Sequence, residues 1–418
     1  MRDDNREFDL LLWGATGFTG ALVAEYLASS EGLGGRLRWA IAGRNRAKLE
    51  RVARELAEQV PGFPADALPI LEADGHDPAS LARLAARTRV LVSTVGPYAL
   101  HGTELLRACA EAGTDYCDLT GEVQWLHRVI ADFDPVARAS GARLVHCCGF
   151  DSVPFDMGVW YLQREALARQ GRAYAEVHGV VRRIRGSFSG GTYASMLNLV
   201  EEASREPALR RVLTDANALL PAGHARGRGR TRNGVAEEPA LGVWTAPFVM
   251  AAVNTKIVRR SNALLGSPWG EDFRYEESMA TGTGTSGRLR ALGMAAGLGG
   301  FMASAAIGPG RALLRRVLPA PGEGPDRAAR EAGSYRIDFL GVAPQEAPRL
   351  VASVSASLDP GYGSTARMLA ECALCLAQDA VPSGGGSWTP AACMAEPLLE
   401  RLRGRAGLDF TLREQAPA

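Results

Sequence analysis

This sequence has very few lysines and no excess of positive or negative charge. Lys48 and Lys256 are the only lysines in 418 residues, and the rest of its 47 basic residues are arginines. Chemistry that needs a lysine amine, such as Schiff-base formation, is therefore confined to two positions. The 47 basic and 46 acidic residues leave a net charge of +1. This balance provides no overall attraction to nucleic acid or to an anionic membrane, so we expect no nucleic-acid partner.

The cysteines and the N-terminal segment lack the marks of a secreted or metal-binding protein. Seven cysteines is an odd number at irregular spacing, and the opening MRDDNREFDL contains no apolar signal-peptide core. Cys372 and Cys375 form a CxxC inside a stretch with helical periodicity, away from the helix N-terminus that a redox pair needs. We therefore expect buried thiols, no metal site and a cytoplasmic protein.

The first strong motif is GATGFTG, which begins at residue 14. It follows the apolar run FDLLLW and precedes the helical pattern of ALVAEYLA, which is the strand–turn–helix order of a dinucleotide-binding unit. Gly14 permits the tight turn, Gly17 lets the backbone approach a pyrophosphate, and Gly20 lets the helix pack on the strand. The alternative is a simple glycine turn. The expected pyrophosphate-binding residues are Gly14, Ala15, Thr16, Gly17, Phe18 and Thr19.

A glycine loop of this kind also occurs in short-chain dehydrogenases, whose catalytic pair is Tyr-x-x-x-Lys. In this chain the positions four residues before Lys48 and Lys256 hold Arg44 and Ala252. No such pair exists anywhere in the sequence, so the ordinary short-chain mechanism is excluded.

The end of the second expected strand, residues 37–45, indicates which dinucleotide is bound. An NAD enzyme is expected to place Asp or Glu there to bind the ribose 2′-hydroxyl, whereas this chain has Arg44. A guanidinium can bind a 2′-phosphate through two hydrogen bonds. A solvated surface arginine is the alternative, but the missing carboxylate favours NADP, with NADPH as the reductant.

Three further expected strands, at residues 67–74, 89–95 and 143–148, alternate with helical patterns. This alternation predicts an α/β fold with a doubly wound parallel sheet of the Rossmann type, which binds its ligand at the carboxyl ends of the strands. Asp74 ends the first of these strands, where it either contacts the adenine ring or caps the next helix. The expected cofactor contacts at this edge of the sheet are Asp74, Gly96, Pro97 and Gly149.

Several longer segments resemble one known family. They are GPY, DYCDLTGE, CCGFDSVPFD, SGGTYAS, LDPGYGSTARMLAECALCLA and GGGSWTPAACMAEPLLERL. They make nearly the whole chain similar to the saccharopine dehydrogenase-like oxidoreductases, and within them to the trans-acting enoyl reductase group. The resemblance implies an enzyme that uses NADPH to reduce a carbon–carbon double bond conjugated to a thioester carbonyl. It also implies a polyketide or fatty acyl substrate, made by a synthase that lacks its own reductase domain.

Changes of pattern along the chain predict three parts. Residues 1–155 form the NADP-binding Rossmann domain, residues 156–360 form an α+β substrate domain, and residues 361–418 form a helical segment that returns to the first domain, as in the resembling family. The Gly/Arg-rich residues 220–240 are either a solvated loop or a docking site for an acidic acyl carrier protein. The apolar segment 291–310 is flanked by arginines. Three alternatives are open for this segment: it lines a lipid pocket, it touches a membrane surface, or it forms a buried helical hairpin.

Reduction of an enoyl thioester needs a donor for the developing enolate oxygen and a proton for the α-carbon. Tyr98 could donate its phenol to that oxygen, or could stack on the nicotinamide. Asp151 could orient a water or the carboxamide, and Tyr193 could supply the α-proton from the second domain. His101 and His146 are expected to be packed residues, although either could titrate near pH 7.

Three functions stay open at this point. They are an enoyl reductase for carrier- or lipid-bound acyl chains, a saccharopine-type imine or amino-acid reductase, and a non-catalytic NADP-binding protein associated with lipid surfaces. Arginines clustered beside the nicotinamide would favour the diacid substrate, and an apolar tunnel ending there would favour the acyl chain. The enoyl reductase is the leading hypothesis, for a cytoplasmic protein with peripheral membrane contact as an option.

Overall fold

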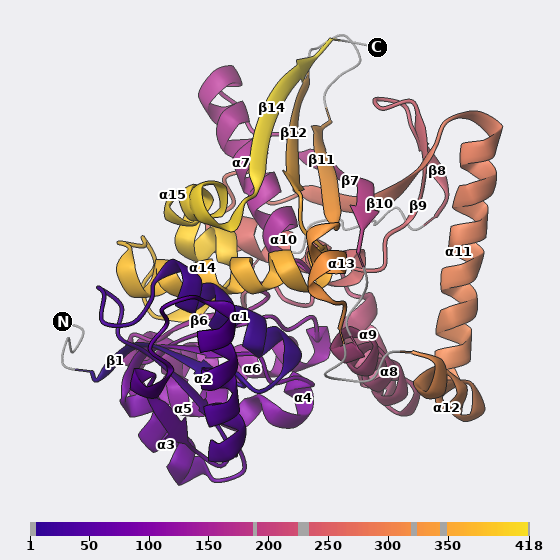
Figure 1. Ribbon diagram of the computed structural model, residues 1–418. Coiled ribbons are helices and arrows are strands. Elements are labelled where there is room, and N and C mark those ends of the chain that lie inside the picture. Colours follow the sequence, from indigo (N-terminus) through magenta and orange to yellow (C-terminus); the bar gives the residue numbers. More distant parts are fainter. Residues whose placement is uncertain (1–5, 187–189, 225–233, 319–323, 343–348, 417–418) are drawn as a thin grey trace.

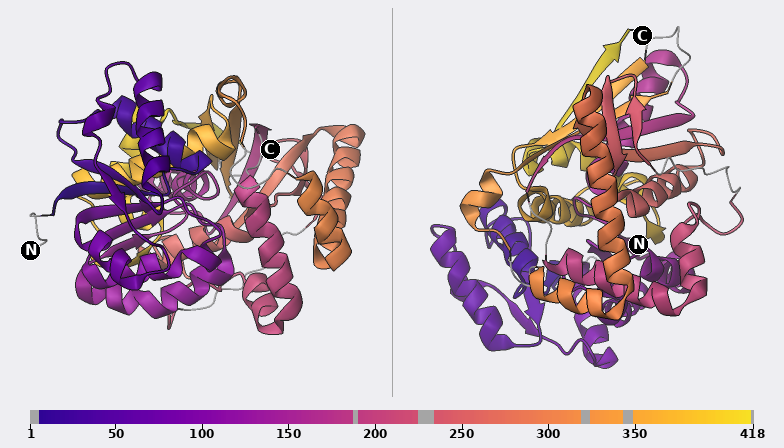
Figure 2. Two further views of the ribbon diagram at one scale, coloured as in Figure 1. Left: turned by 60° about the horizontal axis from the view of Figure 1, so that its bottom comes forward. Right: turned by 90° about the vertical axis from the view of Figure 1, so that its right-hand side faces the viewer.

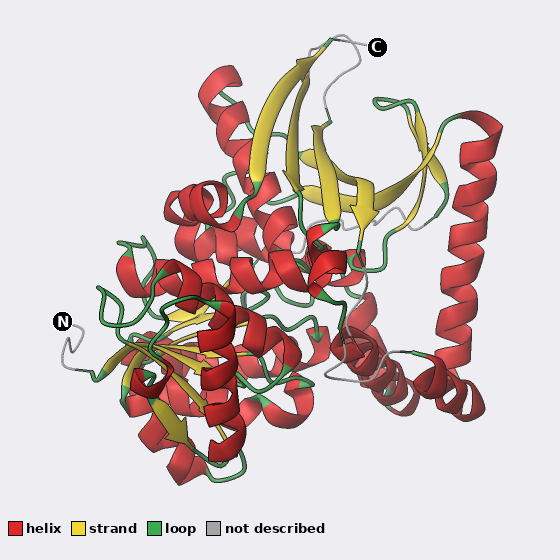
Figure 3. Ribbon diagram, viewed as in Figure 1, coloured by secondary structure: helices red, strands yellow, loops and turns green. Residues whose placement is uncertain are grey.

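Two seven-stranded sheets organise the fold, and helices pack on both of them (Figures 1 and 3). The structure, a computed structural model, describes residues 6–186, 190–224, 234–318, 324–342 and 349–416. Of the predicted 220–240 loop, residues 225–233 therefore lie outside the described residues, while 220–224 and 234–240 are described. The N-terminal part of the chain builds the first sheet, the middle builds the second, and the C-terminal part adds a strand to each.

The first sheet has the strand order β13-β6-β5-β4-β1-β2-β3, and all its described pairings are parallel. Its strands are β1 (Phe8–Trp13), β2 (Trp39–Gly43), β3 (Ile70–Glu72), β4 (Thr88–Ser93), β5 (Asp115–Asp118), β6 (Arg143–Val145) and β13 (Gly386–Trp388). All six residues of β1 are buried, as its unbroken apolar sequence predicts. The strand order reverses between β1 and β4, which is where such a sheet opens a ligand crevice. The predicted doubly wound parallel sheet is confirmed.

Helices cover both faces of the first sheet. The core on one face is formed with α1, α2 and α14, and the core on the other with α3, α5 and α6. Asn45 and Asp77 cap α2 and α3 by accepting backbone N–H groups of the first turn. The bounds are α1 (Phe18–Ser30), α2 (Arg46–Gln59), α3 (Pro78–Ala86), α4 (Tyr98–His101), α5 (Thr103–Ala112), α6 (Val123–Ser140) and α14 (Thr365–Gln378), with a 3-10 turn at Ala65–Ala67.

The second sheet has the order β14-β12-β11-β7-β10-β9-β8; β7 and β10 are parallel, and its other described pairs are antiparallel. Its strands are β7 (Glu176–Arg185), β8 (Ala236–Glu238), β9 (Val243–Pro247), β10 (Arg274–Gly282), β11 (Ser334–Gly341), β12 (Arg349–Ala356) and β14 (Asp409–Gln415). Helix α7 (Val153–Gln170) packs on β11 and β12, and α10 (Ala251–Leu264) packs on β10 and α7. The rings of Phe155 and Phe339 meet edge to face where α7 crosses β11.

The C-terminal segment, predicted to be helical, also contains two strands. Besides α14, it contains α15 (Pro390–Arg401) and short π-helical turns at Pro360–Ser364 and Leu402–Ala406. β13 extends the first sheet beside β6, and β14 extends the second sheet beside β12. In β14 the apolar Phe410 and Leu412 alternate with polar residues, which is the period of a half-buried strand. The segment therefore connects the edges of both sheets.

The apolar segment 291–310 lies within two helices at the side of the second domain (Figure 2). The remaining helices are α8 (Gly190–Arg205), α9 (Pro207–Thr214), α11 (Gly284–Ala306), α12 (Gly308–Val317) and α13 (Arg327–Glu331). In α11 only Gly287, Ala291 and Ala305 are buried, so the alternative of a buried hairpin is wrong. Among the described helices, α11 alone is long and apolar enough to cross a membrane, by length and composition.

All seven cysteines are buried and unpaired. Cys372 and Cys375 lie inside α14 with no exposed surface, as predicted. Burial raises the pKa of six of the thiols, which are Cys109, Cys117, Cys147, Cys148, Cys375 and Cys393. These cysteines therefore act as packing residues rather than as nucleophiles.

The packing of α7 on the second sheet gives a testable prediction. A Cβ placed on Gly158 would lie 2.2 Å from the Phe339 ring, so Gly158→Ala should destabilise the protein by about 1–3 kcal/mol through overpacking. Gly300, in the interior of α11, has open space at its Cβ position, so Gly300→Ala should be neutral or stabilising by up to about 1 kcal/mol. The measurement is the free energy of unfolding in denaturant. A Gly158→Ala variant as stable as the wild type would contradict this packing.

Candidate active site

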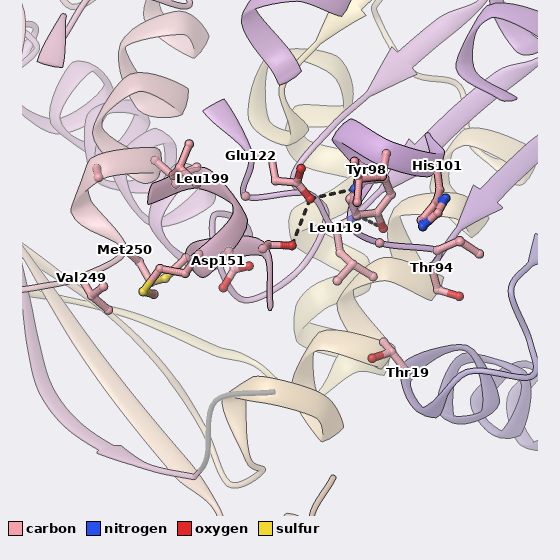
Figure 4. A pocket seen from close by; sticks show the side chains of 18 of the residues that line it. Thr19, Thr94, Tyr98, His101, Leu119, Glu122, Asp151, Leu199, Val249 and Met250 are labelled. Carbon is pink, nitrogen blue, oxygen red and sulfur yellow. Dashed lines mark hydrogen bonds between the residues drawn. The ribbon is translucent and has the colours of Figure 1, made fainter. Parts of the chain in front are cut away.

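A cavity of 1060 Å³ lies at the carboxyl edge of the first sheet, facing the second domain. The glycine loop after β1 and the turns after β2 and β4 form its first-domain wall, and α8, α9, α10 and α11 contribute the opposite side (Figure 4). This is the crevice that the reversal of strand order between β1 and β4 predicts.

The glycine loop has the geometry of a pyrophosphate cradle. Gly14 has a positive φ of 95°, and a Cβ there would lie 2.6 Å from a Val95 methyl carbon. A Cβ on Gly20 would lie 2.1 Å from the Gly14 carbonyl oxygen, so only glycine lets α1 approach this closely. Gly17 precedes α1 without a side-chain cap, and the first turn contains no acidic residue. The N–H groups of that turn are therefore available to an anion, and the loop fits a dinucleotide.

Basic side chains gather beside this loop. Arg44 directly follows β2 and lines the cavity, and none of the described acidic residues forms an ion pair with it. His76 and His101 also line the cavity, with ring centroids 6.3 Å apart. Burial, together with the nearby His76 and Arg44, lowers the pKa of His101. A phosphate would complement this group of side chains, which supports the prediction that Arg44 binds the 2′-phosphate.

The structure brings most of the predicted cofactor residues to the cavity. Those that line it are Gly14, Thr16, Gly17, Phe18, Thr19, Arg44 and Gly96. Ala15, Asp74, Pro97 and Gly149 are not among its described lining residues. The Asp74 carboxylate accepts the backbone N–H of His76, and the residue that caps the next helix is Asp77. A Cβ on Gly149 would lie 3.1 Å from Thr365, so this glycine allows close packing behind the wall.

Of the predicted catalytic residues, Tyr98 and Asp151 share the cavity wall, whereas Tyr193 is not among the described lining residues. Tyr98 is buried, and its hydroxyl donates to the Ser93 carbonyl at 2.9 Å. The same hydroxyl accepts the Leu119 N–H at 3.4 Å, so the phenol is occupied within the wall. Its pKa is raised well above the usual value, chiefly by burial. Tyr98 therefore stabilises the turn after β4, and its role as a proton donor is not supported by this geometry.

Asp151 has the environment of a carboxyl that loses its proton closer to neutral pH than an exposed carboxyl does. It lies in the turn before α7, lines the cavity, and forms no hydrogen bond or ion pair with another described side chain. Burial raises its pKa to about 6. Figure 4 shows Asp151 beside Met250, a residue contributed by the second domain. An acid in this position can act on a ligand that touches both domains.

Two lining residues that the sequence reasoning missed are Glu122 and Lys256. The Glu122 carboxylate accepts the backbone N–H groups of Tyr98 at 2.7 Å and Ala99 at 3.0 Å. It also accepts the Ser195 hydroxyl of α8 at 3.0 Å, so it links the two sides of the cavity (Figure 4). The signal was present, because Glu122 ends the segment DYCDLTGE that carries the family resemblance.

Lys256 lies on α10, and its amine donates to the Ala252 carbonyl at 2.8 Å. Burial, with a smaller effect of Arg259, lowers its pKa to about 8. Its sequence signal was that it is one of only two lysines. Nothing in the local sequence placed it in the cavity, because α10 reaches the first domain only through the tertiary fold.

The side of the cavity formed by the second domain is predominantly apolar. Its large apolar side chains are Met196, Leu199, Val200, Leu213, Phe248, Val249, Met250, Val253, Leu298 and Met302. Arg44 is the only arginine among the described lining residues, and it lies on the first-domain side. The cavity therefore joins a polar cofactor cradle to an apolar chamber.

This arrangement has counterparts among known proteins. Residues 10–145 match the family model of the saccharopine dehydrogenase NADP binding domain. Saccharopine dehydrogenase (L-Glu forming) from Saccharomyces cerevisiae shares the fold, with a TM-score of 0.51 and 13% identity over 97% of this chain and 99% of that chain. The protein is thus an NADP-dependent oxidoreductase with a saccharopine dehydrogenase-like fold, and its cofactor is NADP(H).

Relatives that match along the whole chain define its group. A candidate trans-acting enoyl reductase of Mycobacterium tuberculosis is 43% identical in an alignment 414 residues long, which covers 95% of this chain and 96% of that protein. A trans-acting enoyl reductase of Mycobacterium bovis is 38% identical over 431 residues, covering 99% of this chain and 100% of that protein. The chain belongs to the saccharopine dehydrogenase-like oxidoreductases, in the trans-acting enoyl reductase group, as its sequence motifs predicted.

The assignment of Arg44 to the 2′-phosphate can be tested by binding. Loss of a charged hydrogen bond to phosphate should raise the Kd of Arg44→Ala for NADPH by about 10- to 100-fold and leave the Kd for NADH nearly unchanged. Arg46→Ala is the matched control, because Arg46 is exposed and pairs with Glu50 on α2. Titration calorimetry with both nucleotides provides the measurement. Equal weakening of NADPH and NADH binding would contradict the assignment.

Proposed function

We propose that the protein is an NADPH-dependent enoyl reductase, which reduces the carbon–carbon double bond of an α,β-unsaturated acyl thioester. The observation that carries the proposal is that one cavity joins the cofactor cradle to the apolar side chains of the second domain. The names of the full-length relatives support the same reaction. The substrate would be a polyketide or fatty acyl chain, bound to a carrier protein or a lipid.

The composition of the cavity favours the acyl chain over a diacid. A saccharopine-type substrate carries several carboxylates, which need basic partners beside the reacting carbon. The basic residues among the described lining residues are Arg44, His76, His101 and Lys256. The first three gather beside the glycine loop, where the nucleotide phosphates are expected. This leaves Lys256 alone on the apolar side, which is too few cations for a diacid.

In the proposed reaction, NADPH supplies a hydride to the β-carbon of the enoyl group. The α-carbon then needs a proton, and Asp151 is the described lining acid best suited to give it. Its carboxyl has a pKa of about 6 and no partner among the described side chains, so it is free to approach a ligand. This assigns to Asp151 the role that was expected of Tyr193. The hydride and the proton together convert the double bond to a single bond and leave NADP⁺ and the saturated thioester.

Glu122 and the apolar wall position the substrate for this transfer. Glu122 holds the turn at Tyr98 against Ser195, so it keeps α8 at a fixed distance from the end of β4. The apolar side chains of α8, α10 and α11 exclude water from the acyl chain. An apolar environment also favours the neutral, protonated form of the Asp151 carboxyl.

A substrate panel separates the three functions that the sequence left open. We expect NADPH oxidation with enoyl thioesters of increasing chain length, and none with imines of saccharopine type, because the chamber is apolar. The rate is measured as the decrease in NADPH absorbance, at an NADPH concentration that saturates the protein. Turnover of the imines alone would contradict the proposal. Tight NADPH binding without turnover of any substrate would indicate the non-catalytic alternative.

The proton donor can be tested by Asp151→Asn. Because the protonated carboxyl is the active form, wild-type kcat should fall as the pH rises through about 6. The variant should lose this pH dependence, and its kcat should be about 100- to 10,000-fold lower. Glu104→Gln is the matched control, since Glu104 lines the same cavity, pairs with Arg107, and has no assigned role. An Asp151→Asn variant that keeps the wild-type pH profile would overturn the assignment.

A further inference from the structure

Helices α11 and α12, residues 284–317, form an arm along the side of the second domain (Figure 2). Ten large hydrophobic side chains are exposed in the described chain, and seven of them belong to this arm or its joint. They are Leu289, Leu292, Met294, Met302, Ile307, Leu313 and Val317. Their exposed fractions run from 41% to 74%, so the exposed large apolar side chains of the described chain are concentrated on this arm.

The arm is unusual for a helix in contact with water. Helices that are apolar on all sides are normally buried in a core or in a membrane. In α11, however, Gly287, Ala291 and Ala305 are the only buried residues. Helix α11 contacts β9, β10 and α8 of the same domain and also α12, while most of its other residues are exposed. The described residues therefore leave the outer face of α11 open to an occupant.

The charge of this region indicates which occupant it fits. Residues 278–322 contain no aspartate or glutamate but five arginines, in a chain whose basic and acidic residues are otherwise balanced. Arg311 and Arg315 pair with Glu201 of α8. Arg290 and Arg316 are exposed and form no ion pair with a described residue. A second copy of the same arm would carry the same positive charge and be repelled, whereas an anionic lipid surface would complement it.

The arm also forms part of the cavity. Leu298 and Met302 of α11 line the cavity, and Met302 is at the same time 42% exposed. Met302 thus belongs both to the exposed surface of the arm and to the lining of the cavity that also contains Asp151 and Met250. A hydrocarbon chain that passes Met302 would leave water for a lining rich in apolar side chains.

We propose that the α11–α12 arm lies on an anionic bilayer surface, parallel to the membrane plane, and admits a lipid-borne acyl chain to the cavity past Met302. The inner face of α11 stays packed on β9 and β10, so the helix rests in the interface and does not span the bilayer. The membrane contact is independent of the enzyme activity, and the admission of the acyl chain rests on the function proposed above.

Sedimentation of the full-length protein with vesicles tests the membrane contact without any turnover. We expect binding to vesicles of phosphatidylcholine mixed with phosphatidylglycerol, weaker binding to phosphatidylcholine alone, and a decrease of the former at high salt. Protein that stays in the supernatant with both kinds of vesicle overturns the proposal. Dimers that dissociate when the arm is altered, in a protein that binds no vesicle, would overturn it in favour of a second copy.

Variants locate the contact on the arm. Leu292→Glu combined with Leu313→Glu should lower vesicle binding by about tenfold or more, because both side chains are exposed and would enter the lipid. Arg290→Glu combined with Arg316→Glu should lower binding to the anionic vesicles selectively. The control is Leu167→Glu, since Leu167 is 40% exposed on α7, outside the arm. Equal loss in the control and in the arm variants overturns the proposal.

Turnover then separates this inference from the proposed function. With a soluble, short enoyl thioester, the Leu292→Glu, Leu313→Glu variant should keep wild-type kcat/KM, because neither residue lines the cavity. With an enoyl lipid in anionic vesicles, its rate should fall in parallel with vesicle binding. Unchanged turnover in vesicles would overturn the role of the arm in substrate entry and leave the enoyl reductase intact. No turnover of either substrate by the wild type would instead count against the enoyl reductase, while vesicle binding still decides the contact.

Discussion

The position of the cavity depends on one constraint, which is that the same C-terminal segment is built into both sheets. β13 closes one edge of the first sheet, α14 packs in its core beside α1, and β14 closes an edge of the second sheet. Helix α15, between these strands, packs on α7 and α14. The two sheets are therefore held at a fixed separation by buried elements rather than by a linker. Glu122 adds a polar tie on the other side of the cavity, through Tyr98 and Ser195.

This arrangement divides the chemistry between the two halves of the chain. The first sheet provides backbone N–H groups, arginine and histidine for an anionic nucleotide, while the second domain provides mainly apolar side chains. Where the two halves meet, burial shifts the pKa of Asp151 upward and that of Lys256 downward, toward neutrality in both cases. Burial between the two halves is thus sufficient to bring the pKa values of Asp151 and Lys256 closer to 7.

The sequence predicted what is encoded locally. GATGFTG, its preceding apolar strand and Arg44 are adjacent in the chain, so their spacing alone indicated the cradle and its edge of the sheet. Asp74 and Gly149 follow strands of the first sheet, but whether such residues reach the cavity depends on side-chain direction and, for Gly149, on its packing against Thr365, more than two hundred residues away. Glu122 and Lys256 were not assigned to the cavity from the sequence, because Glu122 acts there through its contact with Ser195 of α8 and because α10 reaches the cavity only through the tertiary fold. The apolar character of residues 291–310 is visible in the sequence, but their exposure is visible only in the structure.

The burial of every cysteine has a practical consequence. Because all seven thiols are packed in the interior, reagents that alkylate or label sulfur would find no native target on the folded surface. The native cysteines would therefore not react in site-directed labelling, and none of them would have to be replaced first. A single cysteine introduced at any exposed position would be the sole point of attachment, so a fluorophore or spin label could report on one place in the molecule at a time.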